Sequence, residues 1–260
     1  MTATPKNATY RLVTGVPYRG LSDASGASCG LDLYHPENAP GFATVVWLYG
    51  GGLVSGQRHV PAELKEQGLA VVAVDYRLHP QVRAPVYIED AAAAVAWTFR
   101  HIASFGGDPA RIFLAGASAG GYLAMLVGLD RRWLAACGES ADRLAGVVAL
   151  TGQMVTHFTV RAERGIPERQ VVVDELAPLF HVRADAPPIL LVTGDRELEL
   201  LGRYEENAFF QRMLKVAGHT QNELHELKGR DHGGVEAPGH ALLLDFVRRT
   251  PAVGGDPRAG

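Results

Sequence analysis

The stretch RIFLAGASAGG at residues 111–121 decides the fold, because an apolar run here enters G-x-S-x-G and continues into a helix-like segment, residues 122–129. Gly116 and Gly120 stand two residues before and two residues after Ser118. A very tight strand-to-helix turn leaves almost no room for side chains at those two positions. The serine hydroxyl would then be exposed at the N-terminus of a helix, which favours developing negative charge. The pattern predicts a nucleophile elbow; the alternative is a plain strand-to-helix turn.

Apolar runs alternate with helix-like segments on both sides of this stretch. Strands are predicted at residues 10–18, 30–34, 43–49, 69–75, 144–150, 188–193 and 222–227 besides the central run, and helices at 61–67, 85–101, 204–216 and 239–249 besides the helix after Ser118. Such alternation predicts one α/β domain over residues 1–260, with a mostly parallel, eight-stranded sheet covered by helices on both faces. The polar, irregular segment 151–187 is expected to form a short lid insert. Ligands of such sheets bind at the carboxyl ends of the strands.

Composition narrows the class of protein. Of the 260 residues, 47% are hydrophobic and 20% charged, and the net charge of −3 lacks the basic surplus of a nucleic-acid binder. The polar N-terminus and the absence of a bilayer-length apolar run predict a cytoplasmic protein with no membrane partner. Cys29 and Cys137 are predicted to be unpaired thiols, and no cluster has metal-ligand spacing, so no metal is expected. The oligomeric state stays open, and a homo-oligomer is compatible with the composition.

A nucleophilic serine needs a base and a group that orients the base. His232, in the loop GRDHGG at residues 229–234, is the one histidine of ten that satisfies both chain order and strand-end position. The orienting acid is expected in GDRELE, residues 194–199. Glu197 is favoured, because it stands three residues beyond the small residue that ends the strand. Asp195, which is the shorter side chain and lies closer to the strand end, remains the alternative.

The oxyanion that forms on attack needs hydrogen-bond donors. The triple glycine at residues 50–52 follows an apolar strand and can bring backbone N–H groups close to a ligand with no side chain in the way. The N–H of Ala119, beside the nucleophile, is predicted to supply another donor. Tyr49, Leu53 and Tyr122 flank these motifs and are predicted to contact the substrate.

Four motifs in this order resemble a known family, the α/β-hydrolase carboxylesterases: YGGG at 49–52, DYRL at 75–78, GGDPARI at 106–112 and GASAGG at 116–121. The nearest branches are the bacterial esterases related to hormone-sensitive lipase and the feruloyl- and acetyl-esterase-like enzymes. The resemblance spans about residues 30–250. It implies a serine hydrolase that cleaves small, short-chain or aryl esters through an acyl-enzyme on Ser118, without a cofactor. It also aligns Gly51 and Gly52 with the second and third oxyanion glycines of the family.

The sequence departs from the family pattern at two places, and each departure leads to an expectation about the active site. Tyr49 stands where the family usually has histidine before the glycines, which leaves the backbone donors intact. The short insert implies an open, shallow acyl pocket, so short acyl chains should be preferred over long lipids.

The rival functions are an arylformamidase-like amidase or a peptidase with the same triad, since the fold and the triad do not determine which substrate is cleaved. A non-catalytic binding protein is a further alternative, although such proteins usually lack the serine or the histidine.

Overall fold

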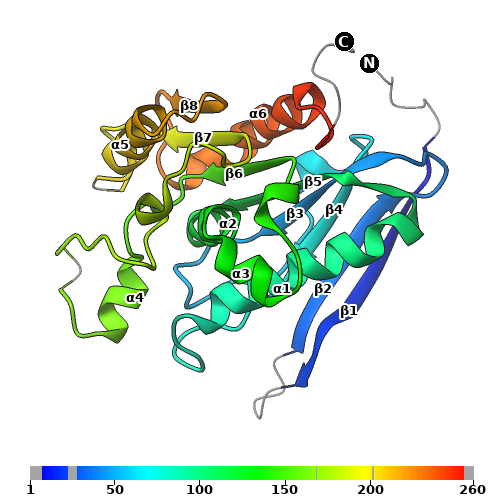
Figure 1. Cartoon of the computed structure of the whole chain (residues 1–260), viewed down its shortest axis with the longest axis horizontal. Coiled ribbons are helices and arrows are strands. Elements are labelled where there is room, and N and C mark those ends of the chain that lie inside the picture. Colours follow the sequence, from blue (N-terminus) through cyan, green and yellow to red (C-terminus); the bar gives the residue numbers. More distant parts are fainter. Residues whose placement is uncertain (1–7, 23–27, 168, 201, 255–260) are drawn as a thin grey trace.

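One eight-stranded sheet organises the chain in the computed structural model, which describes residues 8–22, 28–167, 169–200 and 202–254. Its strand order is β1-β2-β4-β3-β5-β6-β7-β8 (Figure 1). Strand β2 is antiparallel to both of its neighbours, β1 and β4, and all other neighbouring strands are parallel. The bounds are β1 (Tyr10–Ser22), β2 (Ser28–Pro36), β3 (Phe42–Leu48), β4 (Ala70–Val74), β5 (Gly107–Ala117), β6 (Gly146–Leu150), β7 (Ile189–Gly194) and β8 (Asn222–Leu227). The predicted mostly parallel α/β sheet is therefore confirmed.

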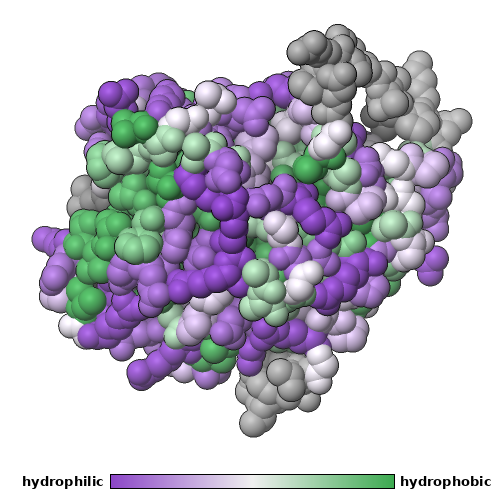
Figure 2. Space-filling view, viewed as in Figure 1, coloured by the Kyte–Doolittle hydropathy of each residue, from purple (hydrophilic) through white to green (hydrophobic). Residues whose placement is uncertain are grey.

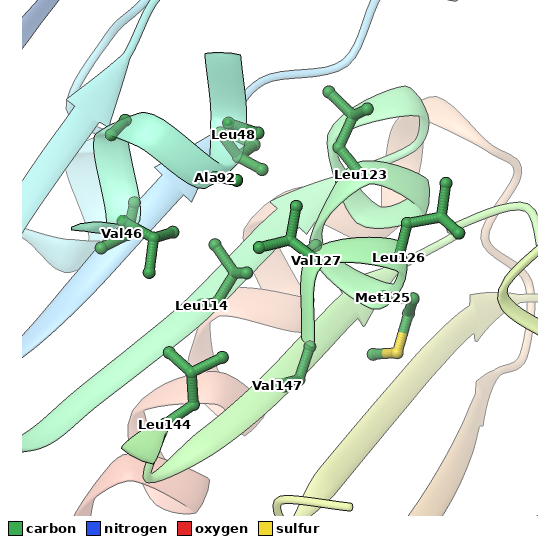
Figure 3. Packing of buried hydrophobic residues seen from close by; sticks show 14 of the residues in the cluster. Val46, Leu48, Ala92, Leu114, Leu123, Met125, Leu126, Val127, Leu144 and Val147 are labelled. Atoms are coloured by element: carbon green, nitrogen blue, oxygen red, sulfur yellow. The ribbon is translucent and has the colours of Figure 1, made fainter. Parts of the chain in front are cut away.

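Helices cover both faces of this sheet. They are α1 (Val86–His101), α2 (Ala119–Leu129), α3 (Arg131–Ala136), α4 (Phe158–Glu163), α5 (Arg203–Val216) and α6 (Glu236–Arg249). Every residue of β3, β4, β6 and β7 is buried, as expected for strands with helices on both sides. On one face, Val46 and Leu114 of the sheet pack in one cluster with Leu123 of α2 (Figure 3). On the other, Phe113 packs with Phe246 of α6.

The structure differs from the predicted elements mainly where they are short. The helix predicted at 61–67 is a single 3-10 turn, Ala62–Leu64, because the chain is extended at Lys65 and has a positive φ of 60° at Glu66. Helix α3 was not predicted; its six residues are too few to show a helical period. It begins where the Asp130 carboxylate accepts a hydrogen bond of 3.1 Å from the Arg132 N–H.

The insert at residues 151–187 adds α4 and lies beside α5 at one side of the sheet (Figure 1). Large apolar side chains remain exposed on these elements, among them Val171, Phe180 and Phe209. Figure 2 shows apolar colour gathered on that side of an otherwise largely hydrophilic face. Cys29 and Cys137 are free thiols, as predicted. None of the helices among the described residues is long and apolar enough to cross a bilayer.

Candidate active site

The turn at Ser118 joins β5 to α2 at the carboxyl edge of the sheet. Ser118 has a φ of 51° and a ψ of −115°, a conformation that is uncommon for a residue with a side chain. The two glycines of the motif are required by close backbone approach. A Cβ on Gly120 would lie 2.0 Å from the Leu48 carbonyl oxygen, and one on Gly116 would lie 2.4 Å from the carbonyl carbon of Gly120. The geometry is that expected of a nucleophile elbow.

His232 faces this serine from the loop after β8. Its Nε2 lies 2.9 Å from the Ser118 Oγ, and its Nδ1 is hydrogen-bonded to the carboxylate of Glu199. Because an ionised carboxylate can only accept, the Nδ1–H donates to it and leaves Nε2 free to accept the serine proton. The imidazole is therefore held in the tautomer that a general base requires.

The partner of His232 is Glu199, so the prediction of Glu197 as the acid, with Asp195 as alternative, was wrong. The Glu199 side chain is fully buried and also accepts hydrogen bonds from the N–H groups of Gly194, at 3.1 Å, and Leu200, at 3.0 Å. Burial alone would raise the pKa of Glu199. The hydrogen bonds from His232 and the backbone outweigh burial, so the pKa lies below the usual glutamate value.

A helical turn after β7 explains the difference. The Glu199 N–H donates to the Asp195 carbonyl at 2.8 Å, which brings the fourth residue after Asp195 back over the end of the strand. The Asp195 carboxylate instead accepts from the Gly229 N–H, at 2.9 Å, and the Glu197 N–H, at 3.2 Å. It therefore ties the acid-bearing loop to the loop that carries His232. Glu199 lies within the segment 194–199 in which the acid was expected, but no pattern in that segment distinguishes it from Asp195 and Glu197.

The glycine loop after β3 lies beside the serine. Gly51 and Gly52 have φ values of 119° and 66°, and a Cβ on Gly51 would lie 2.1 Å from the Ser55 carbonyl oxygen. The insert holds this loop, since the Thr159 hydroxyl of α4 donates to the Gly52 carbonyl at 2.5 Å. Ala119 is the first residue of α2, where backbone N–H groups have no intrahelical acceptor. Gly51 and Gly52 therefore border the space in front of the nucleophile, and the Ala119 N–H follows Ser118 directly in the chain.

That space is a cavity of about 620 Å³ lined by Ser118, His232 and the glycine loop. Tyr49 lines the cavity, but its ring is 3% exposed and stacks on Tyr76, so its contact with a substrate stays a prediction. Leu53 and Tyr122 do not line it, so these two predictions were wrong. Leu53 is fully buried in the core beneath the loop. Tyr122 is also fully buried, because it faces the core side of α2, where its hydroxyl donates to the Leu176 carbonyl at 2.7 Å.

Phe158 and Leu200 contribute apolar surface to the cavity that the sequence did not indicate. Phe158 begins α4, and its ring would lie 3.2 Å from a Cβ on Gly52. Leu200 follows the acid directly and is 48% exposed. Phe158 begins a helix of six residues and Leu200 lies in a loop, so neither segment is long and regular enough to show a period. Among the described residues, no group of three or more His, Cys, Asp or Glu side chains is arranged to hold a metal ion.

The chain matches the BD-FAE family over residues 31–142. It is 29% identical over 256 residues to the esterase LipC of Mycobacterium tuberculosis, a match that covers 85% of this chain and 63% of LipC. It is 37% identical over 193 residues to the probable isoprenylcysteine alpha-carbonyl methylesterase ICMEL1 of Arabidopsis thaliana, covering 63% of this chain and 40% of that protein. The chain therefore spans less than two thirds of the length of these relatives.

Solved structures share the whole architecture. A truncated carbohydrate esterase from gut microbiota superposes with a TM-score of 0.75 at 19% identity, covering 95% of this chain and 99% of that chain. A bacterial heroin esterase superposes with a TM-score of 0.69 at 24% identity, covering 94% and 85%. At these identities, the superpositions establish the fold.

Proposed function

Because the chain has the α/β-hydrolase fold and is similar to carboxylesterases of that fold, we propose that it is a serine carboxylesterase acting on small esters. The observation that carries the proposal is the hydrogen-bonded series from Ser118 through His232 to the buried Glu199, set in a cavity beside the glycine loop. A nucleophile, an oriented base and backbone donors are the parts that acyl transfer needs.

The reaction begins when the Ser118 Oγ attacks the ester carbonyl carbon and His232 Nε2 takes its proton. The N–H groups of Gly51, Gly52 and Ala119 stabilise the oxyanion, and Glu199 stabilises the imidazolium that has formed. His232 then gives the proton to the leaving oxygen, which departs as an alcohol and leaves Ser118 acylated. A water molecule, deprotonated by His232, then attacks the acyl carbon, the bond to Ser118 Oγ breaks, and His232 returns the proton to Oγ as the acid departs.

The proposed substrates carry short acyl chains. Phe158 of the insert packs beside Gly52 and borders the cavity next to the predicted oxyanion site. An aromatic ring in this place limits the length of an acyl group that extends past the glycine loop. Acetyl and butyryl esters are therefore expected to turn over faster than decanoyl esters.

Hydrolysis of p-nitrophenyl acetate, butyrate and decanoate tests both parts of the proposal. The Ser118→Ala variant should lose about 10⁴-fold or more in kcat. Ser104→Ala is the matched control, since Ser104 is exposed and its hydroxyl only donates to the His101 carbonyl, at 2.7 Å. Maximal turnover on decanoate would contradict the chain-length preference. A wild type that cleaves formanilides and none of the esters would favour the amidase instead.

A further inference from the structure

One side of the cavity carries polar side chains that the mechanism does not use. Gln57 and His59 extend from the glycine loop, and Glu236 faces them from the start of α6. The Oε1 of Glu236 lies 3.7 Å from the Nε2 of His59, and their side chains are 42% and 49% exposed. We call these three residues the polar wall.

The polar wall shares the cavity with His232, which acts on the leaving group in the proposed reaction. His232 must protonate the leaving oxygen, so the departing alcohol has to lie against the imidazole. Glu236 is the fourth residue after His232, and Gly233 and Val235 between them also line the cavity. The proposed acyl site lies at Phe158, which borders the glycine loop and belongs to neither segment of the polar wall.

The polar wall is negatively charged. The contact with His59 lowers the pKa of Glu236 more than burial raises it, and the first turn of α6 also favours the ionised carboxylate. The same contact raises the pKa of His59, which adds positive charge only when it is protonated. Among the described residues that line the cavity, there is no lysine or arginine to balance Glu236.

Nearby charges are engaged with other partners. The guanidinium of Arg58 is bound between Asp32, at 2.9 Å, and Asp75. The carboxylate of Glu63 lies 3.1 Å from the Nδ1 of His240, whose pKa is lowered because the ring is buried. At a pH where His59 is neutral, Glu236 is therefore the charged side chain among the described residues that line the cavity.

We propose that the polar wall is a subsite for the leaving group and that Glu236 selects alcohols carrying a positively charged group, such as an ammonium, over neutral alcohols of the same shape. This inference rests on the proposed esterase function. Attraction between opposite charges at the partly exposed distance available here corresponds to a preference of about three- to tenfold. The same carboxylate disfavours leaving groups that carry an anion.

The test compares two acetate esters that differ in charge but not in shape, acetylcholine and 3,3-dimethylbutyl acetate. Their kcat/KM ratio is measured at pH 8.5 and low ionic strength for the wild type, Glu236→Gln and His59→Gln. The wild type should favour the cationic ester about three- to tenfold, and 0.5 M salt should reduce this ratio. Glu236→Gln should bring the ratio to about one, whereas His59→Gln should keep or increase it.

Glu223→Gln is the matched control, because Glu223 also contacts a histidine, His225, at 3.2 Å but lies on β8 and does not line the cavity. Its ratio should equal that of the wild type. A wild-type ratio near one, a ratio unchanged in Glu236→Gln, or a ratio lost in His59→Gln would each overturn the subsite. Loss of turnover on the neutral ester in Ser118→Ala reports on the esterase function separately from the ratio.

Discussion

The elbow at Ser118 and the acid loop that follows β7 each supply one side chain to His232, but the two regions are held in different ways. In the elbow, backbone atoms of β3, β5 and α2 touch so closely that Gly116 and Gly120 have no room for a Cβ. In the acid loop, a buried carboxylate is held by hydrogen bonds from the Gly194 and Leu200 N–H groups. Steric contact determines the residue type at each position. Hydrogen bonds determine only the position of the carboxylate, and a side chain from any of several positions along the loop could place a carboxylate there.

The largest effect is expected at the acid. Glu199→Gln should lower kcat on p-nitrophenyl acetate by about 10³- to 10⁴-fold, because the amide no longer stabilises the imidazolium and can hold the ring in the wrong tautomer. Glu197→Gln is the matched control from the same loop and should change kcat by less than about threefold, since the Glu197 carboxylate does not contact His232. A loss in this control as large as that in Glu199→Gln would contradict the assignment of Glu199 as the acid.

The next prediction tests the steric constraint at the elbow. Gly120→Ala should destabilise the protein by about 3 kcal/mol or more, because its Cβ would meet the Leu48 carbonyl oxygen, which belongs to the central sheet and cannot withdraw. This corresponds to a fall in Tm of roughly 6–12 °C for a domain of this size. Gly20→Ala, at a β1 position with negative φ and nothing within 4 Å of the added carbon, should leave Tm nearly unchanged. Equal Tm values for the two variants would show that the elbow is not sterically constrained.

The smallest effect is a pH dependence of stability that originates in the acid loop. Because the pKa of Glu199 is lower in the folded protein, its ionised form contributes stability that is fully present above the ordinary glutamate pKa, about 4.3. That contribution is lost as the pH falls from this value through the lower folded-state pKa. The difference in urea midpoint between wild type and Glu199→Gln should therefore be greatest at pH 7 and shrink by pH 3.5. A difference independent of pH would contradict the lowered pKa.

The same contrast between steric and polar contacts explains which features of the fold and the site could be predicted from the sequence. The apolar runs buried on both faces, the glycines around Ser118 and the position of His232 after the last strand were all predicted, because each leaves a local pattern. Glu199 was missed because a spacing rule assumed a loop where the chain makes a helical turn. The i, i+4 geometry of that turn, not distance along the chain, decides which carboxylate reaches the imidazole.

Residues that line the cavity were harder to predict than residues that do the chemistry. Leu53 and Tyr122 adjoin the right motifs, but neighbours in sequence point in different directions in a helix or a tight turn. Both side chains are buried in the core. Phe158 comes from the insert, whose short helix has too few residues for a period and whose position depends on tertiary contacts such as that between Thr159 and Gly52.

Through the hydrogen bond from the Thr159 hydroxyl to the Gly52 carbonyl, the insert supports the glycine loop as well as bordering the cavity. Replacing the insert with one from a homologue would change the side chains that border the cavity. In this molecule, an exchange would also remove a support of the loop that carries the oxyanion donors. A transplanted insert therefore has to bring its own hydroxyl donor to Gly52, or the altered selectivity will come with a slower chemical step.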